Sequence, residues 1–279
     1  MLEPFAGLYR GKRVLVTGHT GFKGSWLSLW LGQLGAEVGG FAVDVPTTPS
    51  NFQLTGLESR ISHFVGDIRD RDRLASVLDD FRPEIVFHLA AQALVRRSYA
   101  DPAGTFETNT MGMVNLLECV RTRDWIDAAV LITSDKAYRN DEWVWGYRET
   151  DSLGGHDPYS GSKGSAELVA FSYFQSFLRH TPTQIATTRA GNVIGGGDWA
   201  ADRIVPDSVR AWARDETVAV RRPNATRPWQ HVLEPLSGYL WLGAQLFQRV
   251  SGLNGEPFNF GPGSAESETV AELLEFPQH

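Results

Sequence analysis

Cysteine is almost absent from this sequence. Its 279 residues include a single cysteine, Cys119, so no disulfide can form within the chain. Cys119 lies in an apolar helical stretch beside Leu116, Leu117 and Val120, which predicts a buried thiol without a chemical role. Because proteins without disulfides are typical of a reducing compartment, we expect a cytoplasmic protein.

Long hydrophobic runs and clusters of basic charge are also missing. No segment approaches the ~18 consecutive uncharged apolar residues that would predict a membrane-spanning helix. Residues 1–10 contain no basic leader followed by an apolar run. Basic residues are scattered, as in the pairs Arg96-Arg97 and Arg221-Arg222, and the net charge is −7. We therefore expect no export, no membrane partner and no nucleic-acid partner.

The sequence does contain a regular alternation of short β-branched segments and longer helical segments. This alternation is typical of an α/β fold with a doubly wound parallel sheet, which helices cover on both faces. Strands are predicted over residues 13–17, 37–44, 63–67, 84–91 and 128–134, and helices over residues 22–34, 70–81 and 104–121.

The second half of the chain continues this pattern and then loosens. Asp157 and Pro158 supply a cap and a first-turn proline, which predicts a helix to about residue 179, and residues 184–194 form a sixth predicted strand. We place the end of a cofactor-binding domain at residue 195 and expect a smaller mixed α/β substrate lobe over 196–279. In this lobe we predict strands near 218–221 and 257–260, a helix over 234–249 and a helical start at 269–276.

A glycine-rich loop follows the first predicted strand. Gly18, Gly21 and Gly24 are spaced as GxxGxxG and open an amphipathic helix, so the main chain can approach a pyrophosphate at the helix N-terminus. Lys23 is unusual, because a helix macrodipole disfavours a cation in the first turn. A phosphate or an acidic neighbour would offset this, and a solvated lysine is the alternative. The context predicts a Rossmann-type dinucleotide site formed by Gly18, Thr20, Gly21, Phe22, Lys23 and Gly24.

Residues at the ends of the next strands are further candidates for cofactor binding. Asp44 lies 20 positions after Gly24 (44 − 24), where a carboxylate can hold both hydroxyls of an adenosine ribose. This favours NAD over NADP, and the alternative is a solvated loop aspartate. Asp67 and Ile68, after the third strand, are candidates for the adenine site. The segment after the fourth strand supplies the last candidates: Leu89, Ala90, Ala91 and Gln92.

Two other polar residues near these strands are interpreted as structural. His88 stands on an apolar strand, which favours a packed core histidine over a catalytic group. Asn109 stands within a predicted helix, which favours a residue that bends the helix or satisfies backbone groups.

Candidate catalytic residues lie in two segments, 132–136 and 159–163. Tyr159 and Lys163 are four positions apart and project from one helix face, so the ammonium can lower the phenol's pKa from about 10 and make it a usable base. Asp135 and Lys136, at the end of the fifth strand, add an acid and a base that simple hydride transfer does not need. In contact, and in a water-poor site, these two could exchange a proton. The combination predicts an internal redox reaction with loss of water, and the alternative is a surface ion pair.

Four strings of the sequence resemble the extended short-chain dehydrogenase/reductases, and within them the nucleotide-sugar 4,6-dehydratases. They are TGHTGFKGSW at 17–26, HLAAQALVRRSY at 88–99, TSDK at 133–136 and RPWQH at 227–231. The resemblance implies a bound NAD, and implies that Tyr159, with Ser134 and Lys163, takes the proton of the sugar 4-hydroxyl. Asp135 and Lys136 would then eliminate water across C5 and C6 before hydride returns to C6.

The resemblance carried by these strings also implies CDP-glucose as the substrate and CDP-4-keto-6-deoxyglucose as the product. Lys136 is the most useful discriminator, because the dTDP-glucose and GDP-mannose relatives carry an acidic residue there. No metal is expected.

The resemblance also implies a substrate site beyond the sixth strand. Asn192 is similar to an asparagine that contacts the diphosphate, and Arg203, Arg222 and Arg227 are candidates for the same contact, because guanidinium groups match phosphate oxygens. Arg227 is favoured because it stands in the RPWQH string. His231 either positions the sugar or caps the following helix.

Two other functions are open at this point. A nucleotide-sugar 4-epimerase would need Tyr159 and Lys163 but not Asp135 and Lys136. A non-catalytic NAD-binding scaffold is the second, because family members continue for several tens of residues past the point that matches Phe276, and the substrate lobe is expected to be truncated. The helices at 104–121 and 158–179 carry apolar surface for a two-fold four-helix contact, so we expect a homodimer or a dimer of dimers.

Overall fold

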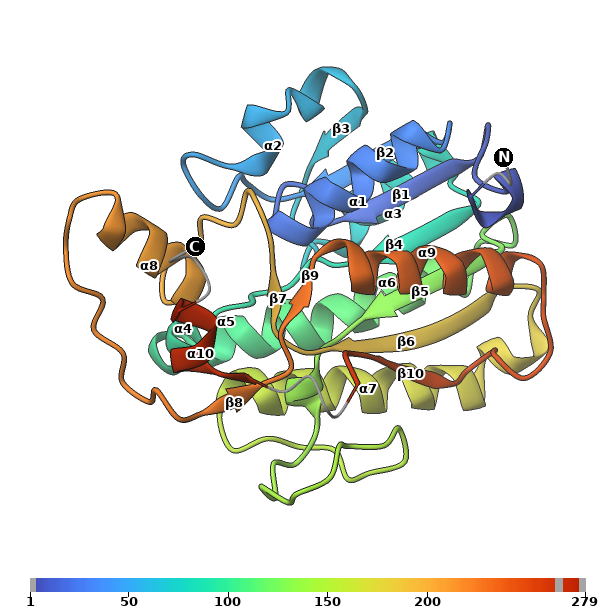
Figure 1. The fold of residues 1–279 in the computed structure, drawn as a ribbon. Coiled ribbons are helices and arrows are strands. Elements are labelled where there is room, and N and C mark those ends of the chain that lie inside the picture. The colour runs from blue at the N-terminus through green and yellow to red at the C-terminus, as the bar shows by residue number, and fades with distance from the viewer. Residues whose placement is uncertain (1–3, 264–267, 276–279) are drawn as a thin grey trace.

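A computed structural model describes residues 4–263 and 268–275 of the chain. Its centre is a seven-stranded sheet in the order β10-β6-β5-β4-β1-β2-β3 (Figure 1). Every strand pair of this sheet is parallel, which confirms the predicted doubly wound parallel fold. The strands are β1 (Arg13–Thr17), β2 (Glu37–Ala42), β3 (Ser62–Val65), β4 (Ile85–His88), β5 (Ala128–Ile132), β6 (Gln184–Ala190) and β10 (Pro257–Phe260).

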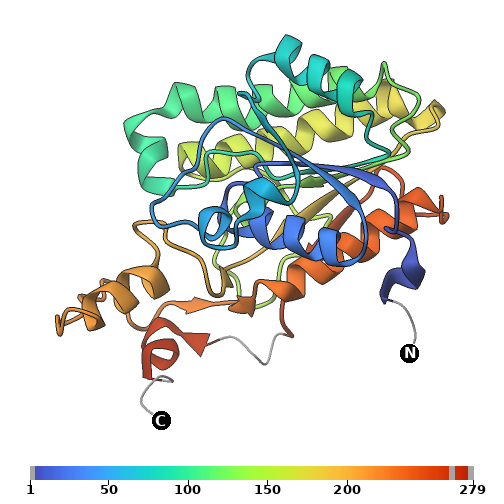
Figure 2. The same cartoon turned by 90° about the horizontal axis from the view of Figure 1, so that it is seen from above.

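Helices cover both faces of the sheet (Figure 2). One layer contains α1 (Phe22–Gln33) and α9 (Leu233–Phe247), and the other contains α3 (Arg71–Phe81), α6 (Gly112–Val120) and α7 (Pro158–Ser176). Successive strand residues enter opposite cores, since Ile85 and Phe87 of β4 join the first and Val86 joins the second. Because both faces are buried, the central strands are apolar throughout.

The remaining elements are short. They are η1 (Pro4–Gly7), α2 (Asn51–Leu54), η2 (Leu57–Ser59), α4 (Val95–Ala100), α5 (Pro102–Phe106), η3 (Glu107–Met111), η4 (Asp135–Ala137), η5 (Leu178–His180), β7 (Val193–Ile194), α8 (Ile204–Trp212), β8 (Thr226–Arg227), β9 (Gln230–His231), β11 (Glu268–Thr269) and α10 (Val270–Glu275).

The first half of the chain follows the predicted order of elements. Each predicted strand is present, and all except β1 end earlier than predicted. The predicted helix over 104–121 is divided into α5, the π-helical turn η3 and α6. The Asp157 side chain caps α7 by accepting a hydrogen bond from the Ser160 backbone nitrogen at 3.0 Å, as predicted. The sixth predicted strand divides into β6 and β7.

Two elements expected in the smaller lobe belong to the main layers instead. β10 pairs with β6 at the edge of the central sheet, and α9 packs on the first layer. The segments that lie outside these layers are α8, the antiparallel pair β8 and β11, and the parallel pair β7 and β9. A domain boundary at residue 195 stays a prediction for these segments.

The strand predicted at 218–221 is wrong, because these residues form no ladder with any described strand; Val218, Ala219 and Arg221 line a pocket together with residues of α8. The helical start at 269–276 is confirmed as α10, although Phe276 lies outside the described residues. No helix within 4–263 and 268–275 is long and apolar enough to cross a membrane.

Candidate active site

The glycine loop turns between β1 and α1 at the carboxyl edge of the sheet. Gly18 has a φ of +73°, and a Cβ there would lie 2.7 Å from the Ala90 backbone nitrogen. A Cβ on Gly24 would lie 2.2 Å from the Gly18 carbonyl oxygen. Gly21, the N-cap of α1, makes no side-chain bond to the first turn. The loop therefore combines a close-packed backbone with an uncapped helix N-terminus, which fits a bound pyrophosphate.

Replacing Gly24 by alanine is expected to destabilise the protein by about 1–3 kcal/mol, because the new Cβ forces the Gly18 carbonyl to move. A loss of NAD affinity of about tenfold or more should accompany it, which corresponds to ~1.4 kcal/mol. Calorimetric NAD titration and thermal unfolding measure both effects. Gly32→Ala is the matched control, since a Cβ at that position of α1 meets nothing within 4 Å. Equal effects of the two substitutions would contradict this account.

The candidates that follow β2 and β3 lie in different surroundings. Thr20 Oγ1 donates to the Asp44 carbonyl oxygen at 2.7 Å, which joins the glycine loop to the exposed loop that carries Asp44. The Asp67 carboxylate accepts hydrogen bonds from Arg69 Nη2 at 2.6 Å and Nε at 3.0 Å, and these bonds hold the Asp67 pKa below its ordinary value. Ile68 is buried in the second core. Their contacts with a cofactor stay predictions.

The segment after β4 is held by Asn109 of the π-turn η3. The Gln92 backbone nitrogen donates to Asn109 Oδ1 at 2.8 Å, and Asn109 Nδ2 donates to the Gln92 carbonyl at 3.1 Å and to Ser162 Oγ at 2.9 Å. The structural interpretation of Asn109 is therefore confirmed. Its link to α7, whose first turn carries the candidate base Tyr159, was not predicted. This segment is partly exposed at Leu89, Ala90, Ala91 and Gln92.

His88 is a core residue, as the sequence indicated. Its Nδ1 lies 2.8 Å from Thr17 Oγ1, and its side chain is buried. Burial, followed by the charge of Lys163, lowers the pKa of His88 to about 3. The ring is therefore neutral at physiological pH.

Tyr159 and Lys163 occupy one buried face of α7. Burial raises the pKa of Tyr159 to about 12, and a hydrogen bond with the Ser134 side chain acts in the opposite direction. Burial, followed by the charge of Lys23, lowers the pKa of Lys163 to about 8, while Glu167 opposes this change. The predicted lowering of the Tyr159 pKa is therefore wrong for the protein without NAD and substrate. Burial raises this pKa more than the nearby groups that favour the phenolate lower it.

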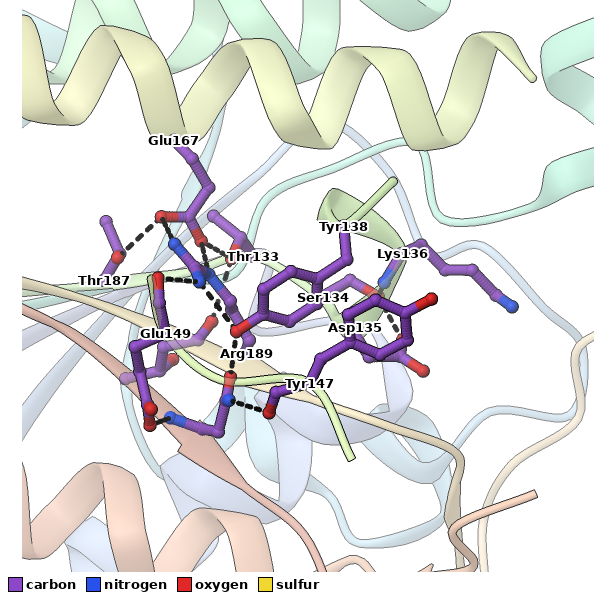
Figure 3. A network of polar contacts seen from close by, with 12 residues as sticks. Thr133, Ser134, Asp135, Lys136, Tyr138, Tyr147, Glu149, Glu167, Thr187 and Arg189 are labelled. Carbon is purple, nitrogen blue, oxygen red and sulfur yellow. Dashed lines mark hydrogen bonds and ion pairs between the residues drawn. The ribbon is translucent and has the colours of Figure 1, made fainter. Parts of the chain in front are cut away.

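The turn at the tip of β5 separates the predicted acid and base. Ser134 Oγ donates to Asp135 Oδ1 at 2.9 Å and accepts from the Lys136 backbone nitrogen at 3.2 Å. Lys136 is exposed, and Figure 3 shows its ammonium extending away from the Asp135 carboxylate. Among the residues that the structure describes, no ion pair joins these two side chains. The two side chains are therefore not in the contact that a proton exchange between them would need.

Asp135 lies instead near Lys23 and Gly191. Burial and then the charge of Arg203 lower the pKa of Lys23 to about 8, while the charge of Asp135 acts in the opposite direction. Asp135 Oδ2 would lie 3.6 Å from a Cβ on Gly191. The acidic neighbour that offsets the unusual position of Lys23 is therefore Asp135.

Arg203 lies near Lys23 and the candidate base Tyr159. It is the N-cap of α8, and its Nη1 donates to Asp198 Oδ2 at 2.9 Å. Its positive charge acts on the pKa of Tyr159 as well as on that of Lys23. Asn192 is partly exposed between β6 and β7, and its carbonyl oxygen accepts from the Gln230 backbone nitrogen at 3.0 Å.

The other substrate candidates follow α8 in the chain. Arg222 is exposed, and Arg227 Nη1 donates to the Thr226 carbonyl at 2.7 Å. His231 Nδ1 accepts from the Leu233 backbone nitrogen at 3.4 Å, where α9 begins. This bond supports the helix-capping alternative for His231. The preference for Arg227 stays a prediction, and of the candidate arginines it is Arg203 whose charge acts on Tyr159 and Lys23.

Comparisons with known proteins identify the family of this chain. A family model described as GDP-mannose 4,6 dehydratase matches residues 15–247. The chain is 52% identical to the CDP-glucose 4,6-dehydratase of Salmonella typhimurium over 272 residues, which are 96% of this chain and 76% of that protein.

Solved structures show the same fold. The epimerase Mth375 of Methanothermobacter thermautotrophicus has a TM-score of 0.82 at 25% identity, over 98% of this chain and 78% of that one. The dTDP-glucose 4,6-dehydratase DesIV of Streptomyces venezuelae, solved with NAD and TYD bound, has a TM-score of 0.79 at 26% identity, over 95% and 79% of the two chains. The chain therefore belongs to the nucleotide-sugar 4,6-dehydratase family of the extended short-chain dehydrogenase/reductases.

Proposed function

We propose that this protein converts CDP-glucose to CDP-4-keto-6-deoxyglucose and water, with no net change in its NAD. The observation that carries the proposal is the Asp135-Lys136 turn next to Tyr159, in a chain that is 52% identical to a CDP-glucose 4,6-dehydratase. A 4-epimerase would use Tyr159 and Lys163 alone, and it would leave Asp135 and Lys136 without a role. The reaction would supply a precursor for deoxysugars.

The carboxyl edge of the sheet fits NAD. The glycine loop, including Thr20, Phe22 and Lys23, would hold the pyrophosphate, because the backbone at Gly18 and Gly24 leaves no room for a side chain and α1 begins there. Asp44 would hold the adenosine ribose. When bound, NAD supplies the acceptor for the hydride of C4 and the donor of the hydride to C6. Asp67, Ile68 and residues 89–92 would line the adenosine and the second ribose.

The residues on α7 and at the tip of β5 would move the protons. Tyr159, hydrogen-bonded to Ser134 and one helical turn before Lys163, would take the proton of the sugar 4-hydroxyl. A ketone at C4 then makes the C5 hydrogen acidic. Lys136 would remove this hydrogen, and Asp135 would protonate the departing 6-hydroxyl; Lys136 would later return the proton to C5 when hydride reaches C6. Because Lys136 is exposed, its side chain must turn toward the sugar, which is a fast rotamer change for a surface lysine.

The substrate diphosphate would lie near α8. Arg203 would contact it from beside Tyr159, and Arg227 and Arg222 would approach from the following segment. Asn192, between β6 and β7, would donate an amide hydrogen bond to it. His231 would hold the start of α9 and so the wall of this site.

Incubation of the purified chain with CDP-glucose and NAD tests the function. Strong alkali should then develop the absorbance of a 4-keto-6-deoxy sugar, and dTDP-glucose and GDP-mannose should give much less. A 4-epimer without this absorbance would support epimerisation instead. Tight NAD binding without conversion of any nucleotide sugar would support a non-catalytic scaffold.

We also propose that the protein is a cytoplasmic homodimer or dimer of dimers. Leu168 and Phe171 of α7 are exposed, as is Met111 of η3 next to α6, so these helices carry apolar surface for a second copy. A native mass spectrum would report subunit number and bound NAD together. A monomer at micromolar concentration would contradict the proposed assembly.

The rate is expected to fall as the pH rises through about 8, because Lys163 then loses the charge that assists Tyr159. The charge of Lys23 lowers the Lys163 pKa, so Lys23→Met should raise that pKa and move the fall to higher pH. Initial rates at saturating CDP-glucose and NAD across this range measure the shift. Lys12→Met, at the other end of β1, is the control. A fall that stays in place in Lys23→Met would exclude this coupling.

A further inference from the structure

Glu167 and Arg189 form a buried ion pair directly behind the tip of β5 (Figure 3). The two side chains are each 3% exposed. Arg189 donates from Nε to Glu167 Oε1 at 2.9 Å and from Nη2 to Oε2 at 3.0 Å. The pair therefore has the bidentate geometry that fixes both partners in one orientation.

Further hydrogen bonds surround the pair. The Glu167 carboxylate accepts from Thr133 Oγ1 and from Thr187 Oγ1, the latter at 2.7 Å. Arg189 Nη1 donates to Tyr138 Oη at 2.7 Å and to the Glu149 carbonyl at 3.0 Å. The two buried charges thus have hydrogen-bond partners from several elements.

Two of these partners bracket the catalytic turn. Thr133 directly precedes Ser134, and Tyr138 directly follows Ala137, so the ion pair is bonded to both ends of the turn that carries Asp135 and Lys136. The turn closes on itself through the Ala137 nitrogen, which donates to the Ser134 carbonyl at 3.0 Å. Its position is therefore set from outside the turn by Glu167 and Arg189.

Glu167 also belongs to the face of α7 that carries the catalytic tyrosine and lysine. Tyr159, Lys163 and Glu167 follow one another at four-residue spacing, and all three are buried. The first two would act on the sugar 4-hydroxyl, and the third holds the turn that would act at C5 and C6. One helix face thus relates the two halves of the proposed reaction.

The same network reaches the loop between the turn and α7. Tyr138 Oη donates to Asn259 Oδ1 of β10 at 2.7 Å, and its ring stacks on Tyr147 at 5.0 Å. Asn259 Nδ2 donates to the Tyr147 carbonyl at 3.0 Å. Tyr138, which accepts a hydrogen bond from Arg189, therefore helps to attach this loop to β10 at the edge of the sheet.

A buried ion pair gives little net stability compared with apolar residues of similar size, because both charges lose their hydration. What it supplies is a fixed geometry. We propose that Glu167 and Arg189 are positioning residues, which hold the turn of Asp135 and Lys136 at the correct distance from Tyr159 for loss of water. This inference rests on the proposed dehydratase function.

The charge-neutral double variant Glu167→Gln/Arg189→Met tests it. The glutamine amide oxygen can still accept from a threonine hydroxyl, and methionine fills the space of the arginine stem, so no unpaired charge is buried. We expect kcat to fall by about 10²-fold with little change in KM, because a displacement of ~1 Å at a reacting group has that effect. NAD affinity and the midpoint of thermal unfolding should stay close to those of the wild type.

Arg189→Lys gives a second, milder measurement. An ammonium keeps the charge but cannot reach both Glu167 oxygens and Tyr138 together, so kcat should fall here as well. Lys12→Met/Glu84→Gln is the matched control, since this ion pair, at 2.8 Å, joins the amino ends of β1 and β4. Its kcat should equal that of the wild type.

Hydrogen exchange gives a readout that needs no substrate. Amides of residues 136–138 should exchange faster in the double variant than in the wild type. Unchanged exchange, or a double variant that turns over normally, would overturn the positioning role. If wild-type protein forms no product from CDP-glucose, the proposed function fails, whereas faster exchange would still support the structural link.

Discussion

Replacing Tyr159 by phenylalanine is expected to lower kcat for CDP-glucose by about 10²–10⁴-fold, because it removes the base of the first step. Neither the absorbance of reduced nicotinamide nor the 4-keto product should appear. The ring is buried, so phenylalanine fills the same space and loses the hydrogen bond with Ser134, which costs about 1 kcal/mol of stability. Stopped-flow absorbance and a product assay measure the two effects.

Tyr173→Phe is the matched control for this substitution. Tyr173 stands on the same helix, and its hydroxyl donates to Glu118 Oε1 at 2.9 Å, on the side of α7 that faces α6. Its removal should change the rate by less than about twofold, as for most substitutions away from a site. If Tyr159→Phe behaves like Tyr173→Phe, the phenol is not the base.

The strands of the sheet could be predicted because their burial leaves few choices of residue. Val14, Leu15 and Val16 of β1 have no exposed surface, so each must be apolar whichever core it faces. The π-turn η3 could not be predicted in this way. It accompanies the bonds of Asn109 to Gln92 and Ser162, which lie 17 and 53 positions away along the chain. No local pattern reports such contacts.

Pairing partners explain why one of two short predicted strands in the second half of the chain is present and the other is not. Val218 and Val220 alternate as in a strand, but residues 218–221 pair with no strand in the part of the chain that the structure describes, and Val218 lines a pocket with Ile204 and Asp207 of α8. Residues 257–260 carry an equally short signal, yet they meet the free edge of β6 and complete the sheet. A strand forms only beside another strand with which it can pair, and the local sequence does not show where that strand lies.

The arrangement of site residues could be predicted where their spacing along a helix alone determines the direction in which the side chains point. Tyr159 and Lys163 share a face because they lie one turn apart. Asp135 and Lys136 lie in a 3₁₀ turn, where successive side chains diverge by about 120°, and so they do not meet. The pair of Glu167 and Arg189 joins a helix to a strand 22 positions away. The spacing of Glu167 from Lys163 was the one available signal for it.

Replacing Asp135 by asparagine is expected to separate the two halves of the reaction. Oxidation at C4 should persist, so reduced nicotinamide should accumulate, while product formation falls by about 10²–10⁴-fold because an amide cannot protonate the departing hydroxyl. The amide oxygen can still accept from Ser134 Oγ, so the turn should keep its shape. Lys136→Ala should give the same separation through loss of the base at C5.

Solvent deuterium distinguishes these two variants. With Asp135→Asn, Lys136 can still remove and return the C5 hydrogen, so deuterium should enter C5 of recovered CDP-glucose. With Lys136→Ala it should not. The opposite pattern would reverse the two roles, and normal turnover by both variants would remove them from the mechanism. Because the Lys136 side chain points outward from the turn that holds Asp135 inward, this experiment also reports whether the lysine turns toward the sugar during catalysis.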